Sequence, residues 1–290
     1  MFSCGYLYDL TMTNTVPEKS GFWSRPSLWK LLSVIVAYLA FYLAVGQVTS
    51  RVFADQIDTD NVVASASSII FGVALPIAIG AIALLIFATK LGWLRDIFGP
   101  QPISGRGWMW IGPIIVVAAI AAHLVGTDWS EWSTGEIVSL IALGVCVGLA
   151  EELLTRGIAV KMLRDAGHRE RFVAVVSSLL FALMHTVNFI AGMELATVLG
   201  TVVYTFGFGM CMYLTMRVTG TIWAAIVLHG LTDPTTILSS GGLDTSVTTE
   251  VSGAAAIASL LTVLLIAFGV VAIFLIRGRV GEDQPTHVTA

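Results

Sequence analysis

The segment AEELLTRG, residues 150–157, places two carboxylates and a guanidinium at the end of a long apolar run. The run starts near Glu136 and is long enough to cross a membrane as a helix. Each charged side chain at the centre of a bilayer costs about 2.5 to 3.5 kcal/mol. Glu152 and Arg156 are four residues apart and can form an ion pair on one helix face. Glu151 points about 100° away from Glu152, so it needs another partner or a function of its own.

The composition is that of an integral membrane protein. Of the 290 residues, 56% are hydrophobic and only 12% are charged, whereas charged residues make up about a quarter of an ordinary soluble domain. The net charge is −4 and the basic residues are scattered, so we expect no nucleic-acid partner. Cys146 and Cys211 both lie in apolar runs, and the three cysteines show no pattern of a disulfide framework or a thiolate metal site.

Apolar runs predict an all-α bundle of about eight transmembrane helices. A helix needs about 20 apolar residues to cross about 30 Å of hydrocarbon. The expected spans are residues 28–48, 67–89, 107–126, 136–160, 172–192, 195–216, 220–238 and 252–276. We expect them to form one transmembrane domain, 28–276, between an N-terminal segment, 1–27, and a tail, 277–290.

The basic residues predict that both termini are cytoplasmic, because cytoplasmic loops of membrane proteins keep an excess of Lys and Arg. Of the 15 basic residues, 13 fall on the side of the N-terminus: Lys19, Arg25, Lys30, Lys90, Arg95, Arg106, Lys161, Arg164, Arg169, Arg171, Arg217, Arg277 and Arg279. The opposite loops hold Arg51 and several acidic residues. An even number of spans agrees with this topology. Richness in Ala, Val and Gly favours a bacterial cytoplasmic membrane.

Three expected spans carry the polar side chains at membrane depth. They are Glu151, Glu152 and Arg156 in the fourth span, His185 in the fifth, and His229 and Asp233 in the seventh. At a rise of about 1.5 Å per residue, Glu151, His185 and His229 all lie about 14 to 20 Å from the cytoplasmic surface, so they can share one pocket. A carboxylate and a histidine that face one water can act as a general-base pair for hydrolysis. His229 and Asp233 can orient donors toward a developing oxyanion.

Asp233 is followed by Pro234, and the residue before a proline is biased away from helical geometry. We therefore expect the seventh span to break or end at this point.

A metal site is the alternative to a water activated by carboxylate and histidine. Two histidines and a glutamate form a known catalytic zinc set, and Glu151, His185 and His229 could supply it, with Glu152 as the base. These residues come from three separate helices and lack the HExxH spacing of helical zinc proteases. We therefore expect a glutamate-type mechanism without a metal or other cofactor, with zinc as the alternative.

The runs EELLTR, FALMH and HGLTD resemble the three motifs of the CAAX protease and bacteriocin-processing (CPBP, or Abi) family, which are Glu-Glu-x3-Arg, Phe-x3-His and His-x3-Asn/Asp. They occur in the family's order within residues 136–238. The resemblance implies an eight-helix intramembrane endopeptidase, whose eukaryotic members remove the last three residues of prenylated CAAX proteins. It also implies that Glu151 and His185 activate the water and that His229 and Asp233 form the oxyanion site. Glu152 and Arg156 would support them.

The chain departs from the family pattern at two positions. Thr155 stands where an aromatic residue is usual, and Asp233 stands where proteases of prenylated substrates usually have Asn. Bacterial relatives are linked to peptide maturation and bacteriocin self-immunity, so the protein or peptide substrate need not be lipidated. Two other functions use the same residues. One is a non-catalytic immunity or assembly factor, and the other is an ion-coupled transporter, because intramembrane carboxylates and histidines also build relays.

Overall fold

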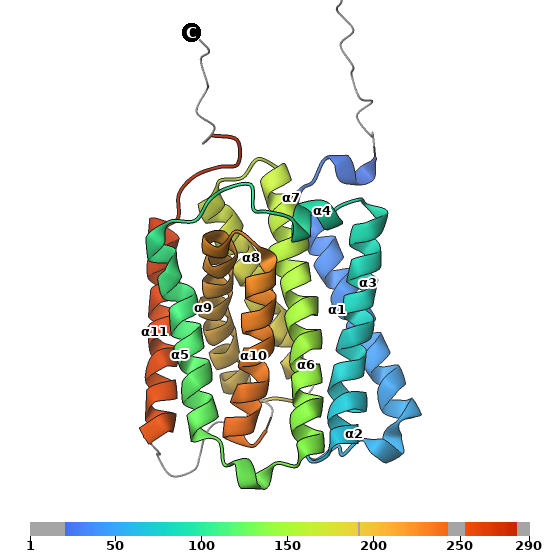
Figure 1. Cartoon of the computed structure of the whole chain (residues 1–290). Coiled ribbons are helices and arrows are strands. Elements are labelled where there is room, and N and C mark those ends of the chain that lie inside the picture. Colours follow the sequence, from blue (N-terminus) through green and yellow to red (C-terminus); the bar gives the residue numbers. More distant parts are fainter. Residues whose placement is uncertain (1–20, 191, 243–252, 283–290) are drawn as a thin grey trace, which may run out of the picture.

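The computed structural model describes residues 21–190, 192–242 and 253–282, in which no β-strand occurs. Long helices run side by side through the molecule (Figure 1). The α-helices are α1 (Leu28–Val52), α2 (Ala66–Ser68), α3 (Leu75–Lys90), α4 (Leu94–Phe98), α5 (Ile111–Gly126), α6 (Thr134–Glu152), α7 (Val160–Asp165), α8 (Glu170–Met184), α9 (Leu195–Thr219), α10 (Ile222–Ser240) and α11 (Gly253–Leu275). The π-helical segments η3 (Ile69–Ala74) and η6 (Leu153–Ala159) join α2 to α3 and α6 to α7, and the 3₁₀ segment η7 (His185–Phe189) follows α8.

The prediction of an all-α membrane bundle is confirmed. Seven described helical segments are long and apolar enough to span a membrane: Leu28–Val52, Ala66–Lys90, Gly107–Gly126, Thr134–Asp165, Glu170–Phe189, Leu195–Thr219 and Gly253–Leu275. They coincide with seven of the expected spans. The remaining expected span corresponds to α10, whose 19 residues include His229, Asp233 and three threonines. This polar helix packs against α5, α6 and α9 inside the bundle.

The first and last long helices place the ends of the described chain at the same end of the bundle, on opposite sides of it (Figure 1). α5 and α11 lie at one side of the bundle, α1 and α3 at the other, and α6, α9 and α10 between them (Figure 1). The start of α1 and the end of α11 lie at the same end of the bundle as α4 and α7 (Figure 1). Most of the expected terminal segments, 1–20 and 283–290, lies outside the described residues. Which membrane side these ends face remains a prediction.

Glycines allow α6 and α10 to touch along their backbones. Gly144 and Gly148 are one turn apart on α6 and face Gly230 and its neighbours on α10. A Cβ atom at Gly144 would lie 2.1 Å from the carbonyl oxygen of Gly230, and one at Gly148 would lie 2.5 Å from that of Ile226. Small residues permit such close approach of membrane helices. The contact brings the glutamates at the end of α6 next to His229.

The prediction that the seventh span breaks at Asp233 is wrong, since α10 continues to Ser240 with Pro234 inside it. Hydroxyl groups donate to backbone carbonyls one turn earlier at Thr232, Thr235 and Thr236. The proline ring fits because Gly144 has no side chain: a Cβ atom there would lie 2.5 Å from Pro234 Cγ. Threonine side chains and a neighbouring helix thus support a membrane helix that contains a proline.

A buried ionic network closes the end of the bundle that carries α4 and α7. Both carboxylate oxygens of Glu170 accept hydrogen bonds from Arg164, at 2.9 and 2.8 Å. Arg217 at the end of α9 donates to Glu170 at 2.8 Å and to the carbonyl of Ser104 at 2.8 Å. Tyr213 also donates to Glu170. The network therefore joins α7, α8, α9 and the loop before α5.

Candidate active site

The predicted site residues converge where α6 passes into η6. Glu151 and Glu152 form the last positions of α6, and Arg156 lies in the π-helical segment η6. His229 comes from the middle of α10, and His185 is the first residue of η7, at the end of α8. π-helical turns inside α-helices often occur at functional sites. The structure therefore gathers side chains from three separate helices at one depth of the bundle.

The predicted ion pair between Glu152 and Arg156 is present. Arg156 Nη1 donates to Glu152 Oε1 at 3.1 Å, and both side chains are fully buried. Arg156 Nη1 also donates to Thr155 Oγ1 at 2.6 Å, and Nη2 donates to the carbonyl of Gly209 at 2.8 Å. The guanidinium lies over the ring of Phe181, 4.7 Å from its centroid. Arg156 thus compensates the buried carboxylate and ties α6 to α9.

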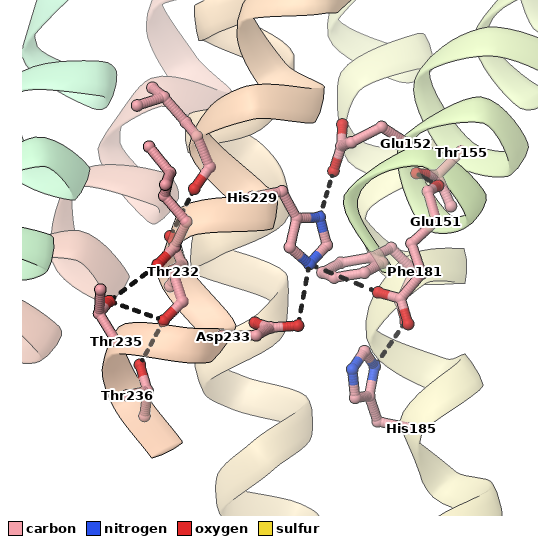
Figure 2. Close-up of polar contacts among 12 residues, drawn as sticks. Glu151, Glu152, Thr155, Phe181, His185, His229, Thr232, Asp233, Thr235 and Thr236 are labelled. Carbon is pink, nitrogen blue, oxygen red and sulfur yellow. Dashed lines mark hydrogen bonds and ion pairs between the residues drawn. The ribbon is translucent and has the colours of Figure 1, made fainter. Parts of the chain in front are cut away.

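His229 is held by Glu152 on one side and faces the other acids on its opposite side (Figure 2). Its Nδ1 is 2.8 Å from Glu152 Oε1, and because an ionised carboxylate only accepts, Nδ1 carries the proton. Its Nε2 is 3.5 Å from Glu151 Oε2 and 3.9 Å from Asp233 Oδ2. Nε2 is therefore the ring nitrogen that faces Glu151 and Asp233, although the histidine itself is only 3% exposed.

His185 and Glu151 face each other across the site (Figure 2). His185 Nδ1 donates to the carbonyl of Phe181 at 3.0 Å, one turn earlier. A carbonyl is an acceptor, so Nδ1 carries a proton, and Nε2 is the ring nitrogen that remains for the site. The Phe181 ring also lies edge-on to both histidines, with centroid separations of 5.0 Å to His185 and 5.6 Å to His229. Phe181 therefore positions both imidazoles.

A cavity of about 90 Å³ opens at Glu151. It is lined by Tyr38, Leu39, Tyr42, Ile77, Glu151, Met184, His185, Val187 and Asn188. The side chain of Glu151 is 21% exposed, whereas that of the adjacent Glu152 is 0% exposed. Of the two neighbouring carboxylates, only Glu151 can therefore contact a water or substrate in this cavity.

A larger cavity of about 390 Å³ lies between α4, η6 and α7. Its lining includes neither site histidine. Its charged residues are largely compensated, since Lys161 pairs with Asp96 at 2.8 Å and with Asp165 at 2.9 Å. We therefore assign the chemistry to the smaller cavity, which contains the carboxylate and imidazole.

Several contacts of the site were absent from the sequence prediction. The hydrogen bond from His229 to Glu152 was not anticipated, nor was the contribution of α1 through Tyr38 and Tyr42. Depth could have indicated the two tyrosines: Tyr38 is ten residues after Leu28, or about 15 Å along the helix. This matches the depth expected for Glu151.

The alternative zinc set, Glu151, His185 and His229, was tested against the geometry of the described residues. Within them, no group of three or more His, Cys, Asp or Glu side chains has an arrangement that could hold a metal ion. His229 Nδ1 is also engaged by Glu152. The absence of a metal in the mechanism remains a prediction.

Comparison with known families agrees with the three motifs. A family model described as type II CAAX prenyl endopeptidase Rce1-like matches residues 132–235. Over this segment, the chain is similar to that family. The match runs from the start of α6 into α10, so it includes every predicted site residue from Glu151 to Asp233. No match was found among curated proteins or among solved structures.

The Rce1-like match confirms the resemblance to the CPBP proteases. At the level of the family, it supports a membrane-embedded endopeptidase of the CAAX type. The helix α1, with Tyr38 and Tyr42, lies outside the matched segment.

Proposed function

We propose that this protein hydrolyses a peptide bond in the cavity at Glu151, with a water activated by Glu151 and His185. The observation that carries the proposal is the contrast between two adjacent carboxylates. Glu152 is buried and shared by Arg156 and His229, while Glu151 is partly exposed and faces His185. A general base must reach the proton that it removes, and only Glu151 can reach a water here.

In the proposed reaction, the water oxygen adds to the carbonyl carbon of the scissile bond. Glu151 accepts the water proton, and His185 orients the water through Nε2. The tetrahedral intermediate then expels the amine as the carbon–nitrogen bond breaks. Glu151 returns the proton to this nitrogen, so the products are a carboxylic acid, which then loses its proton to solvent, and a free amine, and the enzyme is unchanged. These reaction steps need no cofactor or metal.

His229 is the proposed donor to the oxyanion. Glu152 fixes the ring through Nδ1 and directs Nε2 toward Glu151 and Asp233. When Nε2 is also protonated, its N–H points at the oxygen that gains charge. Such preorganised donors contribute about 2.7 to 4 kcal/mol to transition-state stabilisation. Asp233 belongs to this part of the site, where its carboxylate holds His229 or, when protonated, donates alongside it.

We further propose that the site faces the cytoplasm and acts on a peptide or protein segment. The end of the bundle with α4 and α7 carries most of the basic residues, which indicates the cytoplasmic side. The transmembrane domain, residues 28–276, would then lie in a bacterial cytoplasmic membrane and cleave its substrate near the cytoplasmic leaflet. Its substrate is a peptide or protein segment with a CAAX-like end, with or without a prenyl group.

Glu151→Gln tests the proposal because it removes the base and keeps the shape of the side chain. Purified protein in liposomes would be given a synthetic peptide ending in farnesyl-Cys-Val-Ile-Met and the same peptide without the lipid. Loss of the base should lower the cleavage rate by about 10² to 10⁴. Glu131→Gln, at an exposed position in the 3₁₀ turn Trp129–Glu131, is the matched control and should keep the wild-type rate. Wild-type cleavage by Glu151→Gln would overturn the enzymatic proposal.

A further inference from the structure

The helix α1 forms part of the wall of the cavity at Glu151. Three α1 residues line it, Tyr38, Leu39 and Tyr42. The two tyrosines are four residues apart, so they lie one above the other on the same face of the helix. Besides them, the polar side chains of the lining are Glu151, His185 and Asn188. The two phenols are therefore the polar groups that α1 presents to anything bound beside Glu151.

The two rings are held in the cavity wall with their hydroxyl groups still available. Tyr38 is 8% exposed, and its ring fits against α3 because Gly80 has no side chain: a Cβ atom there would lie 3.0 Å from the Tyr38 hydroxyl oxygen. Within the described part of the chain, neither hydroxyl is hydrogen-bonded to another residue. Buried tyrosine hydroxyls normally have a partner. A partner supplied by the substrate would meet this requirement.

The spacing of the two tyrosines along α1 matches a repeat in peptides. Residues four apart on an α-helix are separated by about 6 Å along its axis. In an extended peptide, carbonyls that point to the same side are two residues apart, or about 6.6 Å. A peptide lying along α1 could therefore present two carbonyls, two residues apart, to Tyr38 and Tyr42. Its backbone needs such partners, because an unsatisfied amide at membrane depth costs several kcal/mol.

We propose that Tyr38 and Tyr42 bind an extended peptide substrate by donating hydrogen bonds to two of its carbonyls, two residues apart, and so position the scissile bond against Glu151. The inference rests on the proposed function, and it adds that the enzyme recognises the peptide backbone from α1. Recognition of this kind is independent of the substrate side chains. It gives α1, which lies outside the Rce1-like segment, a direct role in binding.

Tyr38→Phe and Tyr42→Phe remove one hydroxyl each and keep the rings. With the farnesylated peptide described above, each variant should lower kcat/KM by about 2- to 12-fold, the range expected for one net hydrogen bond. Ser33→Ala, which removes a hydroxyl from the same helix that bonds only to Trp29 within α1, is the control and should keep the wild-type value. Unfolding temperatures in detergent should not change in either tyrosine variant.

Substrate analogues separate binding from a structural effect of the tyrosines. Each non-scissile amide of the peptide is replaced in turn by an alkene, which removes the carbonyl. Two positions, two residues apart, should lower kcat/KM for the wild type. One of them should cause no further loss in Tyr38→Phe, and the other none in Tyr42→Phe.

The outcomes distinguish this inference from the proposed function. If Glu151→Gln is inactive while both tyrosine variants cleave at the wild-type rate, the inference is overturned and the function stands. The same holds if alkene and Phe substitutions reduce the rate independently at every position. If the wild type cleaves neither the farnesylated nor the unmodified peptide, both proposals are overturned.

Discussion

Glu152 and His229 lie 77 residues apart in the sequence and are joined by a hydrogen bond of 2.8 Å. The oxygen that accepts this bond also accepts one from Arg156. The ion pair of Glu152 and Arg156 therefore also helps to hold His229 in place. Glu151 is left to face the cavity, so two consecutive carboxylates occupy different environments.

Glu152→Gln should both destabilise the protein and lower its activity. It leaves the buried guanidinium of Arg156 without its counter-charge, and loss of one partner of a buried pair costs about 3 to 5 kcal/mol. It also weakens the support of His229. Thermal unfolding in detergent and peptide cleavage would measure the two effects, with Glu131→Gln as the exposed control. An unchanged unfolding temperature would contradict the role given to the pair.

Gly148→Ala should separate α6 from α10. The added Cβ atom would lie 2.5 Å from the carbonyl oxygen of Ile226, which is backbone and cannot turn aside. We expect a destabilisation of about 1 to 3 kcal/mol and reduced cleavage, because Glu152 and His229 would move apart. Gly46→Ala in α1, where no atom lies within 4 Å of the new Cβ, is the matched control. Equal behaviour of the two variants would show that the close contact is dispensable.

Removal of metal should leave the activity unchanged. After dialysis against a strong chelator, the purified protein should cleave the peptide at its original rate and contain far less than one zinc per chain by mass spectrometry. This expectation follows from a mechanism in which Glu151 and His185 activate the water directly. Loss of activity on chelation and its recovery on addition of zinc would instead support the zinc set of Glu151, His185 and His229.

The sidedness of the bundle can be measured with single cysteines. In a chain whose three native cysteines are replaced by alanine, Asp58→Cys and Arg169→Cys place a thiol at exposed positions in loops beyond α1 and before α8. A membrane-impermeant maleimide should label Asp58→Cys in intact bacterial cells and Arg169→Cys only after permeabilisation. The reverse pattern would invert the predicted topology.

Local sequence properties were sufficient to predict much of the fold. Apolar length located the membrane helices, because a bilayer sets the number of residues that each crossing needs. Helical spacing also predicted the pair of Glu152 and Arg156, since both residues are on one helix. Depth estimates correctly brought His229 near Glu151, although they come from different helices. The roles of these residues in catalysis remain predictions.

The parts that the sequence did not reveal depend on contacts between helices. The proline at position 234 predicted a break at Asp233. The helix α10 continues because threonine hydroxyls bond to its backbone carbonyls and because Gly144, which has no side chain, leaves space for the proline ring. The π-helical segment η6, the choice of Glu152 as the partner of His229, and the wall formed by Tyr38 and Tyr42 all require the packed bundle. No local pattern specifies them.

The ion pair within one turn of α6 and η6 has a consequence for the synthesis of the protein. Glu152 and Arg156 are made almost together and can neutralise each other as their helix leaves the ribosome and enters the bilayer. His229 is made 77 residues later and then docks on a carboxylate that is already in place. The pair of Glu152 and Arg156 can therefore enter the lipid without help from the third motif, and the reactive centre is completed only when α10 has been inserted.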